Sequence, residues 1–88
     1  MNHYYVFAYS SRTETMQFYR LLSQNRIPCQ IINTPRAITL GCGLSVRVAP
    51  QYYGSAASLF ARSSNQSFLG AYDIIMENGV VKTRRVIS

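Results

Sequence analysis

The spacing of hydrophobic and polar residues along the chain predicts alternating strands and helices. Residues 4–9 are aromatic and β-branched, which is typical of a strand. Ser11 and Glu14 then match a capping box, in which the Ser11 hydroxyl accepts from the Glu14 backbone N–H and the Glu14 carboxylate reaches back. A helical apolar face follows, so we expect a helix over about 12–25 that stops before Pro28.

The middle of the chain predicts two further strands joined by a loop. Residues 29–33 form a short apolar run, and Pro35 ends it because proline cannot donate to a sheet ladder. Residues 44–48 alternate between apolar and polar positions, which predicts a third strand. We therefore expect residues 34–43 to form the connecting loop, and a helical spacing predicts a second helix over about 51–63.

The last third of the chain predicts a β-hairpin. A fourth strand is expected over 72–76, and Asn78-Gly79 is a strong hairpin signal because both residues tolerate positive φ. Residues 80–87 should return as a fifth strand. The predicted order is βαββαβ plus a terminal strand, which fits an α+β fold of the ferredoxin-like type with both helices on one face and an extra C-terminal edge strand.

Length and charge narrow the class of protein. The 88 residues predict a single domain, residues 1–88, and 48% hydrophobic residues with 14% charged ones argue against disorder. The net charge of +6 indicates attraction to acidic partners, but the cations are scattered, which favours a diffusely basic surface over a nucleic-acid footprint. Few charges and seven tyrosines indicate a surface that meets a partner or a second copy of the chain.

The first residues and the length of the apolar runs indicate where in the cell the protein is found. The first nine residues lack the basic start and apolar length of a signal peptide, and no run approaches the ~20 apolar residues of a membrane span. We therefore expect a cytoplasmic protein with no membrane partner, in a compartment where thiols stay reduced.

The cysteines do not predict a disulfide or a metal site. Cys29 opens the second strand, and Cys42 lies in the loop beyond its other end, roughly 16 Å away at ~3.3 Å per residue. A disulfide needs Cα atoms within about 7 Å. Two cysteines and His3 are too few for a zinc site, so no cofactor is expected. We expect Cys29 to be a core residue and His3 to be inert.

Cys42 is the residue with the clearest chemical potential. It stands between Gly41 and Gly43, whose backbone N–H groups can point at an anion and which let a partner approach the sulfur. Arg36 and Arg47 lie near in sequence and could supply positive charge to a thiolate. No histidine or lysine base is close, which argues against a protease-like mechanism. The alternative is a small residue that fills a tight turn.

The tyrosines of the first strand leave a binding surface as a second hypothesis. Tyr5, Phe7 and Tyr9 share one face, and we expect them in the core or in a dimer interface. On an open face they could stack bases, as in the RNA-recognition fold. That fold carries aromatic residues on both central strands, however, and residues 44–48 have none. Nucleic acid is therefore not the expected partner.

Two stretches carry a resemblance to a known family. The opening YYVFAYSS and the run IPCQIINTPRAITLGCGLSVRV resemble a small bacterial family of selenium/sulfur carrier-like proteins, formerly a domain of unknown function. The resemblance covers about residues 4–50, and its specific part is Thr34-Pro35-Arg36 followed by Gly41-Cys42-Gly43.

The resemblance implies a non-enzymatic carrier in the cytoplasm. It implies sulfur or selenium held on Cys42 as a persulfide or selenosulfide, received from a desulfurase-type donor and passed to an acceptor that the sequence does not name. The residues expected to bind the anion or a partner are Thr34, Pro35, Arg36, Gly41, Gly43 and Arg47. The alternative function is a non-catalytic interaction or nucleic-acid-binding module with a basic, tyrosine-rich surface.

Overall fold

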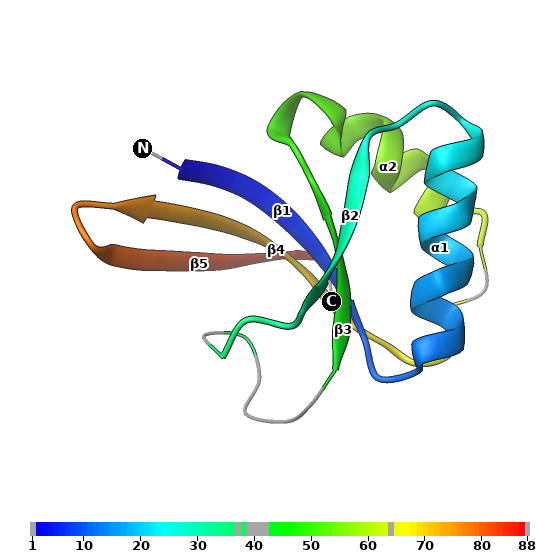
Figure 1. Cartoon of the computed structure of the whole chain (residues 1–88), viewed down its shortest axis with the longest axis horizontal. Coiled ribbons are helices and arrows are strands. Elements are labelled where there is room, and N and C mark those ends of the chain that lie inside the picture. The colour runs from blue at the N-terminus through cyan, green and yellow to red at the C-terminus, as the bar shows by residue number, and fades with distance from the viewer. Residues whose placement is uncertain (1, 37, 39–42, 64, 88) are drawn as a thin grey trace.

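The computed structural model describes residues 2–36, 38, 43–63 and 65–87 (Figure 1). It confirms the α+β class, with a five-stranded sheet and two α-helices. No helix among the described residues is long and apolar enough to cross a membrane. The elements are, in order, β1 (Asn2–Tyr9), α1 (Arg12–Gln24), β2 (Cys29–Asn33), β3 (Leu44–Val48), the 3₁₀ turn η1 (Pro50–Tyr52), α2 (Tyr53–Phe60), β4 (Phe68–Glu77) and β5 (Val80–Ile87).

All neighbouring strands of the sheet are antiparallel, in the order β2-β3-β1-β4-β5. Side chains alternate between the two faces of a sheet, so each strand contributes to both. The Phe7 ring contacts Phe18 of α1 and Phe60 of α2, with ring centroids 4.9 and 5.7 Å away. Both helices therefore cover the face that carries Phe7, here called the helix face (Figure 1). The opposite face, which carries Val6, is called the outer face.

The core lies between the helix face and the two helices. Phe7 and Tyr9 are buried, and Tyr5 stacks on Tyr53 with ring centroids 4.2 Å apart. The prediction that the β1 aromatic residues belong to the core is confirmed. Burying one large apolar side chain contributes about 1.5–3 kcal/mol, so these rings fix β1 against both helices.

Helix α1 begins as the capping pattern predicts, but the second half of the predicted capping box is wrong. The Glu14 N–H donates to the Ser11 Oγ at 3.2 Å, which satisfies one free amide of the first turn. The Glu14 carboxylate does not reach back to Ser11. It accepts instead from the backbone N–H groups of Gln66 and Ser67, at 3.0 and 2.5 Å. Glu14 therefore fastens the segment before β4 to the start of α1.

Helix α2 is shorter than the predicted 51–63. It is preceded by η1 and ends at Phe60, where the Asn65 side-chain amide donates to the Phe60 carbonyl at 2.9 Å. The same amide also donates to the Ser63 carbonyl at 2.9 Å. Because Asn65 takes carbonyls that a longer helix would use, the chain leaves the helix after two turns.

Strand β4 is longer than the predicted 72–76, because it begins at Phe68. Gly70 and Ala71 are weak strand formers and gave no signal in the sequence. They pair with Ala8 and Phe7 of β1, so the partner strand holds them extended. This is a tertiary effect that local propensity does not contain.

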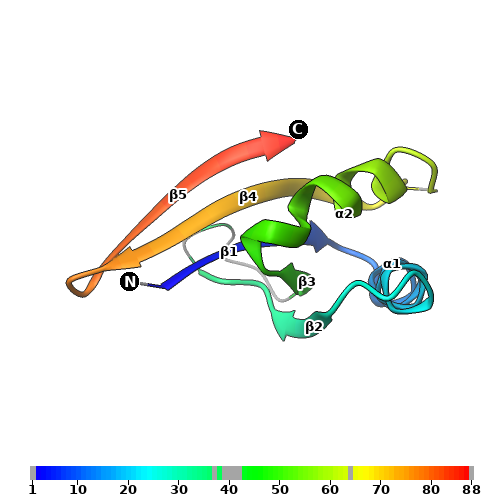
Figure 2. The same cartoon turned by 90° about the horizontal axis from the view of Figure 1, so that it is seen from above.

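The predicted hairpin between β4 and β5 is confirmed. Asn78 and Gly79 both have positive φ, 52° and 77°. Two consecutive residues in this region are the signature of a type I′ turn, whose twist matches the flanking strands. The turn lies at the opposite end of the molecule from α1 (Figure 2).

Candidate functional site

The loop that carries the Gly-Cys-Gly motif has its two stems held together by Thr34. The Thr34 N–H donates to the Gly43 carbonyl at 2.9 Å, which extends the β2–β3 ladder past the Asn33–Leu44 pair. The Thr34 and Ser45 hydroxyls lie 2.7 Å apart, and both residues are buried. Thr34 was expected to bind an anion or a partner, but its polar groups are used inside the protein.

Thr34 and the backbone of Tyr9 lie close to the Cα atom of Gly43. A Cβ atom there would lie 3.3 Å from the Thr34 Oγ1 and 3.4 Å from the Tyr9 carbonyl oxygen. The first distance is tighter than most Cβ contacts, so the Thr34 side chain would have to shift by a few tenths of an ångström. Glycine therefore allows this loop to enter β3 directly beside the end of β1.

The rest of the predicted loop site is only partly described. Pro35 and Arg36 lie in a turn that is closed by the Ile38 N–H donating to the Pro35 carbonyl at 3.0 Å, and Arg36 is exposed. Gly41 and Cys42 lie outside the described residues, as does the predicted separation of Cys42 from Cys29.

Arg47 is separated from the loop stem. It lies on the outer face, paired with Val6 of β1, four residues along β3 from Gly43. At about 3.3 Å per residue this is roughly 13 Å. Its guanidinium carbon lies 4.2 Å from the centroid of the Tyr4 ring. The structure therefore brings Thr34 and Gly43 together, whereas Arg47 lies on the outer face, away from the loop stem.

A polar hollow of about 230 Å³ adjoins the loop stem at the start of α1. Its lining residues come from the β1–α1 junction and from the facing ends of β2 and β3: Ser10, Arg12, Asn33, Gly43 and Leu44. Arg12 is the first residue of α1, and a helix N-terminus carries partial positive charge. The hollow is therefore lined by a cationic residue at a helix N-terminus and by Gly43, the residue that follows Cys42.

The sequence did not reveal Arg12 or Asn33 as site residues. The capping pattern at Ser11 does mark Arg12 as the first helical residue. What places it beside the loop is the pairing of Tyr9 with Leu44, which brings the end of β1 to the start of β3. This pairing depends on the strand order, which no local signal carries.

Cys29 has the surroundings of a structural thiol. It is half-buried against the core, and its Sγ lies 3.8 Å from both the Tyr19 carbonyl oxygen and the Ser23 hydroxyl. Burial raises the pKa of the Cys29 thiol, which keeps it protonated and a poor nucleophile. Cys29 was expected to be a core residue, and the structure places it at the edge of the core, partly buried and packed against it.

His3, which the sequence led us to expect to be inert, contacts a buried carboxylate. Its Nε2 lies 2.5 Å from one carboxylate oxygen of Asp73, and an Arg84 Nη lies 3.2 Å from the other. Asp73 is 6% exposed, and each of its two carboxylate oxygens has a polar partner. In the described part of the chain, no three His, Cys, Asp or Glu residues are grouped as a metal site requires.

The comparisons with known proteins identify a family. The model of the family described as "Putative Se/S carrier protein-like" matches residues 4–72. The match covers well over half of the chain, so the protein belongs to this family. It extends beyond the residues 4–50 on which the resemblance rested and includes α2 and the first half of β4. Neither the search of curated proteins nor that of solved structures returned a match.

Proposed function

We propose that the protein is a non-enzymatic carrier that holds sulfur or selenium on Cys42 as a persulfide or selenosulfide. The observation that carries the proposal is the family match, which spans both the loop and the hollow beside it. Gly43 lines the hollow, and Cys42 is the residue bonded to it. The motif and a positively charged recess therefore adjoin each other.

The chemistry of loading is a sulfur transfer between two thiols. The Cys42 thiolate attacks the terminal sulfur of a persulfide on a desulfurase-type donor. A new S–S bond forms on Cys42, the S–S bond of the donor breaks, and the donor cysteine leaves as a thiolate. The same step with an acceptor nucleophile removes the sulfur again. A selenium atom bound to the donor sulfur would move in the same way.

The cationic groups near the loop would stabilise the negative charge that this transfer involves. A persulfide is anionic, and so is the thiolate that accepts the sulfur. Arg12 and the N-terminus of α1 favour negative charge in the hollow, and the exposed Arg36 adds to this on the other stem of the loop. Catalytic acids and bases come from the donor and the acceptor, which we place with this carrier in the cytoplasm.

We also infer that the fold is ferredoxin-like, with β5 as an additional C-terminal edge strand. The strand order β2-β3-β1-β4 and the helices that follow β1 and β3 support this assignment. The family match ends at residue 72, within β4, which supports the interpretation of the β4–β5 hairpin as an addition.

Mass spectrometry of the intact protein tests the proposal. After incubation with a persulfide donor, we expect an adduct of about 32 Da that maps to Cys42 and disappears with dithiothreitol. Cys29→Ser is the matched control and should load normally, since Cys29 is packed against the core. Equal loading of Cys42→Ser, or no adduct on the unaltered chain, would rule out the carrier function.

The hollow has its own test. Arg12→Gln removes the guanidinium from an exposed position, so the fold should be unaffected. We expect the rate of Cys42 loading to fall severalfold, with a smaller loss in high salt, because screening already weakens the charge in the parent protein. Arg20→Gln makes the same charge change further along α1 and should load at the parent rate.

A further inference from the structure

Strand β5 forms an open edge of the sheet. Its only neighbour in the part of the chain that the structure describes is β4, and residues 80–85 are all exposed. Figure 2 shows β5 at the margin of the molecule, with β4 between it and β1. About half of the backbone N–H and C=O groups of an edge strand point away from the sheet, so they are available to a further strand.

The cations of β5 disfavour its pairing with a second copy of the chain. Lys82, Arg84 and Arg85 lie within four residues, and β5 contains no acidic residue. Two antiparallel β5 strands would bring three positive charges from each copy together, and like charges on neighbouring strands are destabilising. A strand that carries carboxylates would compensate these cations instead. The charge of this edge therefore favours an acidic partner.

Lys82 and Arg84 present their charges on the same face of the sheet. Lys82 pairs with Ile75 and Arg84 pairs with Asp73, so both cations lie on the helix face. A hollow of about 270 Å³ adjoins them, to which Ile75 contributes apolar surface. Arg84 donates to Asp73 at 3.2 Å, but its side chain is 74% exposed and stays accessible. Because Lys82 and Arg84 are two residues apart, they match carboxylates at alternate positions of an added strand.

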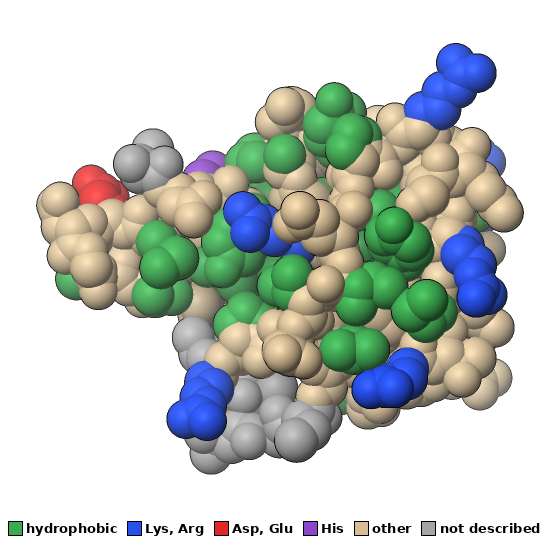
Figure 3. All heavy atoms as spheres, viewed as in Figure 1, with side chains coloured by type: hydrophobic (Ala, Val, Ile, Leu, Met, Phe, Trp, Pro, Cys, Tyr) green, Lys and Arg blue, Asp and Glu red, His purple; other side chains and the backbone are tan. Residues whose placement is uncertain are grey.

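The β4–β5 hairpin also exposes apolar side chains beside this edge. Met76, Val80 and Val81 are 39%, 55% and 45% exposed, and Met76 pairs with Val81 across the hairpin. They are three of the four exposed large hydrophobic residues in the described part of the chain. Figure 3 shows hydrophobic atoms on the surface of this end of the molecule. On an added strand, the residues between the carboxylates would lie on the outer face with Val81 and could cover it.

We propose that β5 binds an extended acidic segment of another protein by strand addition, with carboxylates at alternate positions against Lys82 and Arg84. In this mode of recognition, main-chain hydrogen bonds supply affinity and alternate side chains supply specificity. All of β5 lies beyond residue 72, where the family match ends. The binding edge is therefore separate from the region that defines the family.

The edge is also separate from the loop stem. Leu44, the first residue of β3 after the loop, pairs with Tyr9, and Tyr9 pairs with Phe68 at the start of β4. Lys82 pairs with Ile75, seven residues further along β4, which is roughly 23 Å at ~3.3 Å per residue. Strand addition at β5 does not use the Gly-Cys-Gly motif, so the inference stands independently of the carrier function.

Fluorescence anisotropy with labelled peptides tests the proposal. The probe is a peptide of about eight residues in which glutamate alternates with valine, and the comparison peptide has the same composition with its glutamates in one block. We expect the alternating peptide to bind at low salt. The block peptide should bind at least about fivefold more weakly, because only alternation places the carboxylates on one face of a strand.

Two N-methylated versions of the alternating peptide test the main-chain hydrogen bonds. One version is methylated on its odd-numbered residues and the other on its even-numbered residues. Every second residue of an added strand donates to β5, so only one of the two versions should lose affinity, by at least about tenfold. A purely electrostatic contact would not distinguish the two versions.

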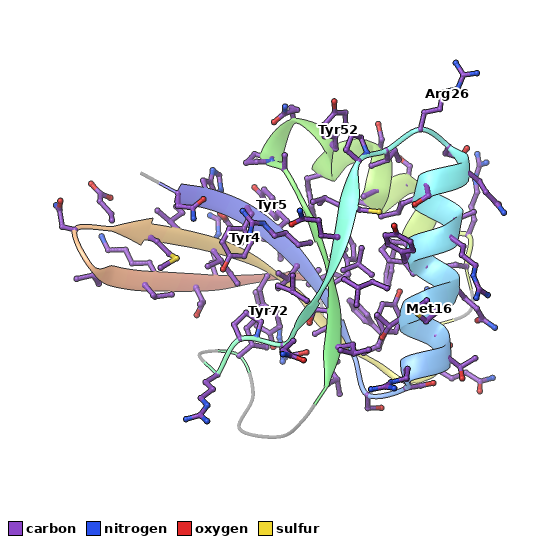
Figure 4. All side chains as sticks on the ribbon, viewed as in Figure 1. Tyr4, Tyr5, Met16, Arg26, Tyr52 and Tyr72 are labelled. Atoms are coloured by element: carbon purple, nitrogen blue, oxygen red, sulfur yellow. The ribbon has the colours of Figure 1, made fainter. Side chains whose placement is uncertain are left out.

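Charge reversal on β5 tests the contribution of its cations. Lys82→Glu places a carboxylate on the edge and should weaken binding of the alternating peptide at least about fivefold. Arg26→Glu is the matched control, since it makes the same charge change at the far end of α1, on the opposite side of the molecule from β5 (Figure 4). Its affinity should stay within about twofold of the parent, because screening weakens charges beyond a Debye length.

Far-UV circular dichroism establishes that both variants are folded, and sedimentation velocity gives the oligomeric state of the parent protein. The proposal is overturned by equal losses in Lys82→Glu and Arg26→Glu, by equal binding of the alternating and block peptides, or by the same result with both N-methylated peptides. It is also overturned by no binding at low salt, or by a stable dimer of the parent protein that the alternating peptide does not dissociate.

Discussion

Replacing Gly70 with alanine should destabilise the protein through two separate effects. The first is backbone strain, because Gly70 has φ of +149°, a conformation that residues with a Cβ atom rarely adopt. The second is steric, because the new methyl group would lie 3.0 Å from the Tyr72 Cε1 and 3.2 Å from its hydroxyl oxygen. Both effects act in the native state, at the point where β4 meets β1.

The magnitude follows from these two contributions. Holding a non-glycine residue in this region costs about 1–3 kcal/mol. The contacts involve the far end of the Tyr72 side chain, which can shift, so the steric cost should be near the lower end of the usual range, about 1 kcal/mol. We therefore expect a loss of about 2–4 kcal/mol in the free energy of unfolding, a large part of the stability of a domain of this size.

Urea denaturation followed by circular dichroism measures this loss. The double variant Gly70→Ala/Tyr72→Ala should lose less stability than the sum of the two single variants, because Tyr72→Ala removes the steric partner. Gly54→Ala is the matched control. Gly54 is the second residue of α2 and has no neighbouring atom within 4 Å of a new Cβ, so alanine should stabilise by about 0.5–1 kcal/mol. A Gly70→Ala protein as stable as the parent would refute the reasoning.

Three further substitutions test the packing and the polar contacts. Hydrogen bonds from Ser67, first from its side chain and then from its backbone, lower the pKa of Glu14 in the folded protein. The ionised carboxylate therefore stabilises the fold at pH values above its unfolded pKa of about 4.3. This stabilisation is lost as the pH falls through the pKa of Glu14 in the folded state. Glu14→Gln should thus lower the melting temperature at neutral pH, with the difference from the parent shrinking towards pH 3; a difference that does not change with pH would contradict this. Tyr9→Phe removes the hydroxyl that donates to Asn65 at 2.9 Å and should cost about 0.5–1.5 kcal/mol in chemical denaturation. Leu22→Ala truncates a fully buried side chain of α1 and should cost about 2–5 kcal/mol, whereas a loss below 1 kcal/mol would show that the core collapses around the gap.

The local elements of this protein follow from residues that are close in sequence. Ser11 with Glu14 predicts the start of α1, and Asn78-Gly79 predicts the β4–β5 turn, because a cap and a two-residue turn each depend on a few neighbouring side chains. Period-two alternation likewise predicts β3 at Leu44–Val48. These signals suffice for the α+β class and for the burial of the β1 aromatic residues.

Where the local sequence signals failed, contacts between distant segments of the chain determined the structure. β1 draws Gly70 into β4 by pairing it with Ala8. The Glu14 carboxylate leaves its own cap for Ser67, more than fifty residues away in the chain. Each outcome depends on a hydrogen-bond partner that is brought near only when the sheet has formed.

The Gly-Cys-Gly motif itself, with Arg36 nearby, was already evident in the sequence, and so was the family to which the chain belongs. The tertiary structure changed which arginine lies beside this motif, from the expected Arg47 to Arg12. It placed Arg12 beside the loop stem, because β1 and β3 are neighbours, and it placed Arg47 on the outer face, where the two-residue period of β3 directs its side chain to Tyr4. Sequence alone therefore determined which residue types carry the chemistry, whereas the pairing of strands determined which of them meet.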